Sequence, residues 1–158
     1  MVLLFGAALF VPSITGRLPE RVATHFDAAG NANGYMSRET YHVFTLWFTL
    51  GLPIFIAAVT ALIPKLLPPQ LINVPHRAYW FAPERAQDSL AFLSEQGIWF
   101  GCILLIFLCS VDWLVVSANA TDPVHLPATP FATAMALFFA ALGLWMLRMF
   151  KRFGRPPE

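Results

Sequence analysis

The sequence predicts an all-α integral membrane protein, a bundle of four transmembrane helices that forms one membrane domain over residues 1–158. Hydrophobic residues make up 58% of the chain and charged residues only 12%, whereas a soluble domain carries about 25% charged residues. This apolar excess is too large to bury in a core of this size. The apolar segments are separated by polar or proline-rich stretches, and we expect spans at about 2–16, 42–67, 98–118 and 131–150.

The first two apolar segments differ in strength as membrane spans. Residues 2–15 would form a helix about 20 Å long, short of the roughly 30 Å hydrocarbon core, and Pro12 interrupts them. They lack the basic start and the cleavage site of a signal peptide, so we interpret them as a short anchor helix or as the end of a longer one. Residues 42–67 are long enough to cross, and Pro53 predicts a kink in that span.

The last two segments are flanked by sequence that predicts how their helices begin and end. Residues 83–90 are polar and compatible with a helix, and we expect this amphipathic cytoplasmic stretch to lead directly into the third span. Gly97 and Gly101 lie four residues apart, a spacing that permits close helix contact and weakly favours a dimer. The fourth segment is followed by a basic tail that begins at Lys151.

The distribution of basic residues predicts the orientation of the chain. Cytoplasmic segments of membrane proteins carry an excess of Lys and Arg. With both termini inside, the inner side holds Lys65, Arg77, Arg85, Arg148, Lys151, Arg152 and Arg155, and the outer side holds Arg17, Arg21 and Arg38. We therefore expect an N-in, C-in arrangement with residues 16–41 outside. Without the weak first span, three crossings would remain.

The outer loop concentrates turn residues and polar groups. Its glycines permit a tight reversal, which predicts an ordered loop. Three histidines, His25, His42 and His125, fall on the outer side near acidic residues, a combination that suits metal binding or proton sensing. No HExxH motif or cysteine pair accompanies them, so no metal ligand is assigned, and ligand recognition and a purely structural lid are the main alternatives. The candidate ligand-binding residues are His25, Phe26, Asp27, Gly30, Gly34 and Asp112.

Asp112 is the acidic residue of the third predicted span. An acid within a span costs roughly 2.5–3.5 kcal/mol on insertion scales and usually faces the bundle interior with a partner. We consider Arg38, His42 and the His25 loop as its candidate partners. Three roles stay open: a proton or ligand site, a structural ion pair that holds the outer loop to the bundle, or an acid that reaches the interface beside Trp113.

The inner loop, residues 68–96, contains an aromatic and basic segment. Tyr79 and Trp80 suit the headgroup level of a bilayer, and Arg77 and Arg85 suit anionic lipid. We therefore predict that these four residues contact lipid, with a cytoplasmic protein partner as the alternative. The sequence shows no nucleophile with a base and no paired carboxylates, so no catalytic residue and no cofactor is predicted. The net charge of +1 gives no indication of nucleic-acid binding.

The outer loop resembles a known bacterial family. Residues 18–34 read LPERVATHFDAAGNANG, which resembles the signature of the family called domain of unknown function 1648, where such a segment separates two hydrophobic helices. Residues 72–85, INVPHRAYWFAPER, are similar to a segment of some relatives. The resemblance implies a protein of the bacterial cytoplasmic membrane. The same module begins the SdpI-type proteins, which give immunity to a secreted killing peptide, although their C-terminal half has no counterpart in this sequence.

Three functional hypotheses follow from these observations. The first is a binding or sensing module with an immunity-like role, whose outer loop recognises a peptide, a lipid or a partner protein while the inner loop transmits or anchors. The second is an accessory subunit of a larger membrane complex. The third, which we favour least, is a small membrane enzyme or transporter that uses Asp112 and the outer histidines. The expected partners are the lipid bilayer and a peptide or membrane protein, with a homo-oligomer as a further option.

Overall fold

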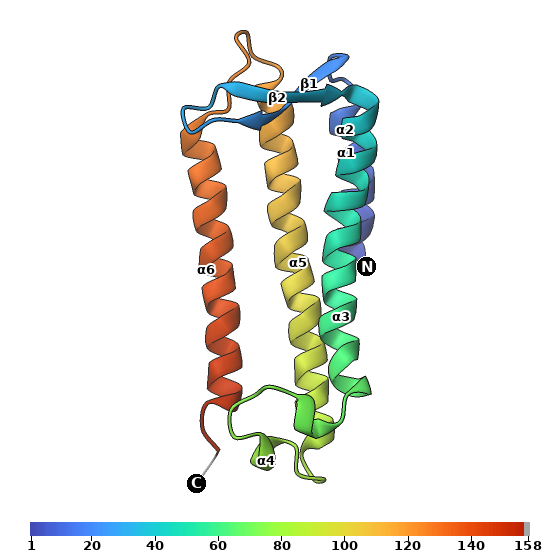
Figure 1. Cartoon of the computed structure of the whole chain (residues 1–158), viewed down its shortest axis with the longest axis vertical. Helices are drawn as coiled ribbons and strands as arrows, with labels where there is room; N and C mark the ends of the chain where they lie inside the picture. Colours follow the sequence, from blue (N-terminus) through green and yellow to red (C-terminus); the bar gives the residue numbers. More distant parts are fainter. Residues whose placement is uncertain (157–158) are drawn as a thin grey trace. The chain divides into compact units, whose positions relative to one another are not determined.

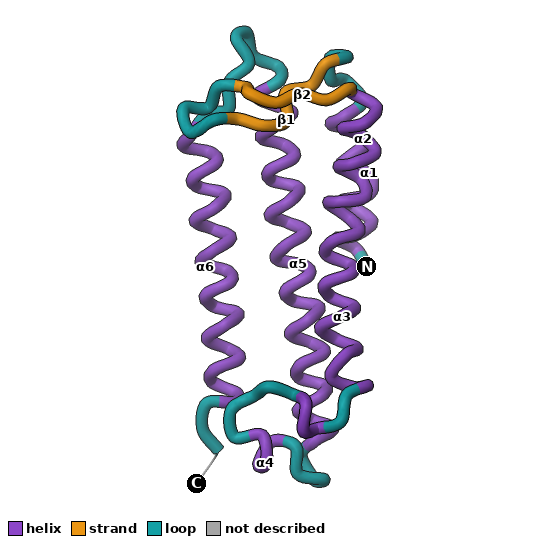
Figure 2. The backbone as a smooth tube through the Cα atoms, in the orientation of Figure 1, coloured by secondary structure: helices purple, strands orange, loops and turns teal. Residues whose placement is uncertain are grey.

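The computed structural model describes residues 1–156 as helices joined by short loops, with one small antiparallel sheet (Figure 1). The helices are α1 (Val2–Thr15), α2 (Arg38–Leu46), η1 (Trp47–Gly51), α3 (Leu52–Leu66), η2 (Pro69–Leu71), α4 (Arg77–Trp80), α5 (Ala86–Ala118) and α6 (Ala128–Phe153). The strands are β1 (Arg21–Phe26) and β2 (Ala32–Ser37). The sequence predicted an all-α fold, and the structure is mostly helical. The two strands, drawn in orange in Figure 2, are a feature that the sequence analysis does not predict.

Three helical segments are long and apolar enough to cross a membrane. They are α2 continued by η1 and α3 (Arg38–Leu66), α5 and α6. Each begins before the apolar segment predicted for it, because a helix continues into polar flanking residues that hydropathy alone does not mark. α1 has 14 residues, about 21 Å of helix, which is short of the roughly 30 Å hydrocarbon core. The membrane character of the chain is therefore supported, and the fourth crossing stays a prediction.

The sequence predicted a kink at Pro53, and the structure has one π-helical turn just before this proline. This turn, η1, covers Trp47–Gly51. A proline ring clashes with the carbonyl four residues earlier and offers no N–H, and a widened turn before it relieves that clash. The turn also contains Thr49, whose side chain is buried. Single π-helical turns of this kind are frequent at functional positions.

The contacts within the chain divide it into two compact units. The first, here called the hairpin unit, consists of residues 1–52 and 104–138. The second, here called the α4 unit, consists of residues 53–103 and 139–158. Each unit takes part of α5 and part of α6, and the two are described in turn.

In the hairpin unit, the sheet packs against the C-terminal end of α5. β1 and β2 pair antiparallel, with Val22 opposite Met36 and register shifts on either side of His25. Val22 is fully buried and forms a cluster with the buried side chains of Leu18 and Tyr41. Partly buried apolar side chains of β2 and α5 complete this small core; they are Met36, Val115 and Val116. The hairpin is thus fixed to α2 and α5 by apolar packing.

In the α4 unit, α3 and α5 approach each other closely at two glycines. A Cβ atom at Gly97 would lie 2.9 Å from the backbone nitrogen of Ala61, and one at Gly101 would lie 2.8 Å from the Cβ of Ala57. Side chains larger than hydrogen would therefore push these helices apart. The glycine pair predicted from the sequence serves a contact within the chain, so it does not present a free face for a dimer.

Candidate functional site

The tip of the β1–β2 hairpin is a turn closed by the side chain of Asp27. One carboxylate oxygen, Oδ1, accepts hydrogen bonds from the backbone N–H groups of Ala29 at 2.9 Å and of Asn31 at 2.8 Å. The other oxygen accepts a bond from the Asn31 amide at 3.3 Å. Hydrogen bonds that favour the charged form lower the pKa of the Asp27 carboxyl, and the bond from the Asn31 backbone has the largest effect. The carboxylate is therefore held within its own turn.

Gly30 brings the hairpin tip against the loop between α5 and α6. Its φ of +83° lies in the left-handed region, which glycine adopts without strain. Its carbonyl accepts a hydrogen bond from the Leu126 N–H at 2.9 Å. A Cβ atom at Gly30 would collide with the Leu126 carbonyl and lie 2.8 Å from Cε1 of His125. Glycine is thus required here both for conformation and for space.

A second attachment of the hairpin lies at the end of α5, where Asn119 contacts β1. Oδ1 of Asn119 accepts a hydrogen bond from the Ala23 N–H at 2.8 Å, and Nδ2 donates one to the Ala23 carbonyl at 2.9 Å. Sequence reasoning missed this residue. The available signal was its position directly after an apolar span, where a polar residue often ends a helix.

Gly34 makes room for the His25 ring across the sheet. A Cβ atom at Gly34 would lie 2.9 Å from the Cβ of His25 and 3.0 Å from its Cδ2. The His25 side chain itself is exposed. Gly34 does not line the pocket beneath the hairpin, but the absence of a side chain at Gly34 allows the His25 ring to take its position.

A pocket of about 440 Å³ lies between the hairpin, α5 and α6. Four of the six predicted ligand-binding residues, His25, Phe26, Asp27 and Gly30, line it, whereas Gly34 and Asp112 do not. The helices contribute apolar walls. The remaining lining residues are Thr24, Ala28, Val111, Leu114, Val115, Leu126, Ala128, Phe131 and Ala132. The structure thus joins the predicted loop residues to helix residues that the sequence analysis did not select.

Asp112 has a partner other than those predicted. The hydroxyl of Thr49 donates a hydrogen bond of 2.6 Å to its Oδ2. The expectation that Arg38, His42 or the His25 loop pairs with Asp112 is therefore corrected, because the π-helical turn η1 brings Thr49 to face α5. No ion pair with Asp112 is found among residues 1–156. In place of the predicted ion pair with the loop, the structure has a hydrogen bond between η1 and α5.

The three histidines predicted to lie on the outer side do not come together. His25 lines the pocket, the ring of His125 packs against Gly30, and Nδ1 of His42 lies 2.6 Å from the hydroxyl of Thr15. Among residues 1–156, no group of three or more His, Cys, Asp or Glu side chains could hold a metal ion.

The residues predicted to contact lipid on the inner side take part in packing within the α4 unit. Trp80 is only 4% exposed. Its Nε1 donates a hydrogen bond to the Phe153 carbonyl at 3.2 Å, and the Arg152 guanidinium lies 4.3 Å from its ring centroid. Trp80 therefore keeps little exposed surface, and its predicted contact with lipid or with a partner stays a prediction. The end of α6, which is distant in sequence, covers this side chain.

The other three inner residues keep more of their surface. Arg85 lies over the Tyr79 ring, 4.0 Å from its centroid, and donates a hydrogen bond to the Tyr79 carbonyl at 3.0 Å. Arg77 is exposed and donates a hydrogen bond to the carbonyl of Gln70. Their contact with lipid or with a cytoplasmic partner stays a prediction.

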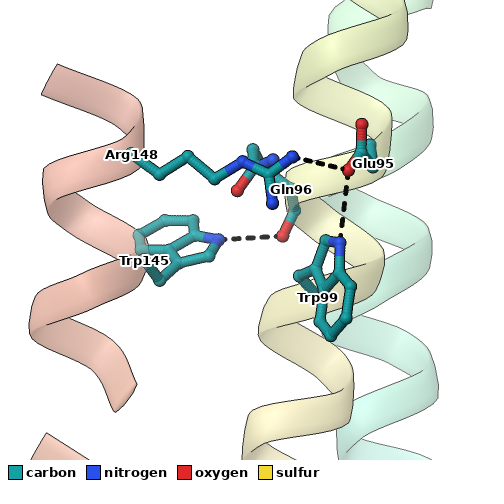
Figure 3. Close-up of polar contacts among 5 residues, drawn as sticks. All are labelled: Glu95, Gln96, Trp99, Trp145 and Arg148. Carbon is teal, nitrogen blue, oxygen red and sulfur yellow. Dashed lines mark hydrogen bonds and ion pairs between the residues drawn. The ribbon is translucent and has the colours of Figure 1, made fainter. Parts of the chain in front are cut away.

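A polar group that the sequence analysis did not select lies where α5 meets α6 in the α4 unit (Figure 3). Arg148 pairs with Glu95 at 2.9 Å, and Nε1 of Trp99 donates a hydrogen bond to the same carboxylate at 3.2 Å. Nε1 of Trp145 donates a bond to the Gln96 carbonyl at 2.9 Å. Charged groups on spans tend to be paired in this way because lipid does not solvate them.

Comparison with known proteins identifies the first part of the chain. Residues 1–56 match the family model described as Domain of unknown function (DUF1648), which confirms the resemblance predicted from the outer loop. The match covers α1, the hairpin, α2 and η1, and thus the hairpin side of the pocket. The α5 and α6 side lies outside it. No curated protein and no solved structure matches the chain.

Proposed function

We propose that this chain, whose residues 1–56 carry the domain of unknown function 1648, is a binding or sensing module of the bacterial cytoplasmic membrane. In this proposal both termini are cytoplasmic, four helices form a bundle in one membrane domain, and the hairpin lies on the outer face. The pocket of about 440 Å³ beneath the hairpin is the recognition site. The observation that carries the proposal is that His25, Phe26, Asp27 and Gly30 line this pocket together.

The hairpin is held in place before any ligand arrives, which supports a binding role. Asn119 fixes β1 to α5, and Gly30 fixes the tip to the α5–α6 loop. A preorganised pocket with apolar walls and a few polar groups is typical of small-molecule sites. Such a site suits a lipid or an apolar segment of a peptide or partner protein, and an immunity-like role would require recognition of this kind.

The two other hypotheses receive less support from the geometry. A transporter or enzyme centred on Asp112 and the outer histidines would need these groups to share one cavity, yet Asp112 bonds to Thr49 outside the pocket. An accessory subunit would use the same outer surface as an interface, and it should purify with a second chain at fixed stoichiometry. A monodisperse isolated protein would speak against the accessory role.

A substitution that fills the pocket tests the proposal. Ala132 lines the pocket on α6, so Ala132→Trp should exclude a ligand. The matched control is Leu62→Trp, because Leu62 is exposed on α3 and does not line the pocket. Native mass spectrometry of protein extracted gently from bacterial membranes should show a bound species in the wild type and in Leu62→Trp, and none in Ala132→Trp. An equal bound fraction in all three proteins would refute the pocket as the site.

Substitution of a polar residue of the pocket distinguishes a role of the hairpin in ligand recognition from a purely structural role as a lid. We expect His25→Ala to weaken retention of the bound species while the hairpin amides stay protected from hydrogen exchange. Loss of that protection in His25→Ala would instead support a lid whose role is to hold the fold.

A further inference from the structure

A second and larger cavity lies in the hairpin unit, at the depth of the spans. It is a groove of about 1050 Å³ between α1, α5 and α6. Side chains such as Phe10, Leu105 and Leu137 line it, and a Cβ atom added at Gly6 would meet nothing within 4 Å. No charged residue of the part of the chain described, residues 1–156, lines the groove. Because α5 and α6 are apolar enough to cross a membrane, hydrocarbon is the chemistry that this groove accepts.

The groove and the pocket beneath the hairpin meet at one side chain. Leu114 of α5 lines both cavities. On α6 the linings are consecutive in sequence, since Thr129 and Pro130 belong to the groove and Ala128 and Phe131 to the pocket. An apolar groove in the span therefore adjoins a partly polar pocket at one end of the same helices. This order, apolar within the bilayer and polar at its surface, is that of an amphiphile.

The charges of the pocket restrict the head of such an amphiphile. The polar side chains that line the pocket are Thr24, His25 and Asp27, and neither Lys nor Arg lines it within residues 1–156. A phosphate in the pocket would lie near the like-charged Asp27 carboxylate and would have no cationic side chain of the pocket lining as a partner, so the two negative charges would repel each other. A hydroxyl or another uncharged polar group meets no such penalty, because Thr24 and His25 offer hydrogen bonds.

We propose that the two cavities together bind a neutral membrane amphiphile, with its hydrocarbon chains in the groove and an uncharged hydroxyl-bearing head beneath the hairpin. The inference rests on the proposed function and specifies the class of ligand. Phe26 and Gly30 of the hairpin line the pocket that receives the head.

Photolabelling of the full chain in phosphatidylcholine vesicles tests this inference. The probe is a diacylglycerol with a photoactivatable group in one chain, and the comparison is phosphatidic acid with the same chains. We expect diacylglycerol to label peptides of the groove, such as those with Leu105 and Leu137, several-fold more strongly than phosphatidic acid does. Equal labelling by the two lipids would overturn the inference, because lipid would then only surround the protein.

Substitutions of groove residues test whether the photolabelling occurs in the groove. Ala134 lines the groove, so Ala134→Trp should reduce diacylglycerol labelling several-fold, and Gly6→Leu should do the same if the tryptophan impairs folding. Leu144→Trp, on an exposed part of α6 outside the groove, should label as the wild type does. Unchanged labelling in both groove variants, or a stable dimer whose crosslinks cover the groove, would overturn the inference.

The pocket variant Ala132→Trp distinguishes failure of this inference from failure of the proposed function. If both hold, Ala132→Trp loses the bound species and the selectivity for diacylglycerol over phosphatidic acid. Loss of the bound species without any change in lipid labelling would overturn the assignment of the ligand as an amphiphile, and the pocket would remain the proposed binding site. An unchanged bound fraction in Ala132→Trp would refute the pocket itself.

Discussion

The side-chain amide of Asn119 forms hydrogen bonds with both backbone polar groups of Ala23, at 2.8 and 2.9 Å. Its Nδ2 also donates to the Val115 carbonyl one turn earlier in α5. A side-chain amide that matches a backbone N–H and C=O behaves like one further residue of a strand pair. Through this contact the end of a membrane helix sets the height of the hairpin above the pocket.

Substitution of Asn119 should detach β1. Ala23 is fully buried, so Asn119→Ala leaves its N–H and carbonyl without partners, at a cost of about 1–3 kcal/mol in the free energy of unfolding. Asn119→Asp keeps an acceptor but loses the donor, and we expect an intermediate effect. Hydrogen exchange of the Ala23 amide in nanodiscs measures this directly. Protection equal to that of the wild type in Asn119→Ala would contradict the role of the amide.

Gly30 should tolerate alanine poorly. Its positive φ alone costs an L-residue roughly 1–2 kcal/mol, and the added Cβ would collide with the Leu126 carbonyl. Gly143 is the matched control, because a Cβ there meets nothing within 4 Å and helix propensity favours alanine by up to about 1 kcal/mol. Thermal unfolding should therefore show a loss for Gly30→Ala and no loss for Gly143→Ala. Equal midpoints for the two variants would contradict the prediction.

The Asp27 turn should depend on pH in one direction. The pKa of Asp27 in the fold lies below its ordinary value of 3.8, chiefly through the hydrogen bond from the Asn31 backbone. Its stabilisation of the turn is therefore complete above pH 3.8 and is lost as the pH falls through the lower folded pKa. The NMR shift of the Asn31 amide should report this transition. Asp27→Asn keeps an acceptor and should abolish the transition, and its persistence in that variant would assign it to another group.

Thr49 and Asp112 should be coupled energetically across the two spans. Hydrogen bonds between helices in membranes contribute about 0.6 kcal/mol on average and up to about 1.7 kcal/mol, so Thr49→Val should lower stability by an amount in this range. Thr49→Ser keeps the donor and should retain most of it. A double-mutant cycle with Asp112→Ala, followed by unfolding in mixed micelles, measures the coupling. A coupling of zero would show that the bond does not form in the membrane.

The close approach of α3 and α5 should depend on Gly97. Gly97→Leu would place a side chain where the backbone of Ala61 lies, and we expect the two helices to separate and the protein to lose stability. Gly143→Leu introduces the same side chain in open space and serves as the control. Analytical ultracentrifugation should show that Gly97→Leu leaves the oligomeric state unchanged while the unfolding midpoint falls. A change of oligomeric state without loss of stability would restore the dimer interpretation.

The sequence by itself determined the membrane character of this protein, its long helical segments and the family resemblance of residues 1–56. Apolar segments such as 98–118 and 131–150 are strong signals because lipid requires long runs of apolar side chains with internally bonded backbone. The motif around His25 and Gly30 identified the loop of residues 16–41 as an ordered element. Both signals are local, since they depend on residues that are neighbours along the chain.

Only the tertiary structure decided which distant groups meet. The strands depend on pairing between two short segments and on packing of Val22 against α5. The alternation of apolar residues and the β-propensity of such short segments do not predict this pairing. Asn119 reaches Ala23, and Thr49 reaches Asp112, because a hairpin and a π-helical turn set the heights of these groups. The pocket likewise combines loop residues with α5 and α6. Hydrogen bonds and cavities between segments far apart in sequence depend on distances in space, and these are fixed only when the helices pack.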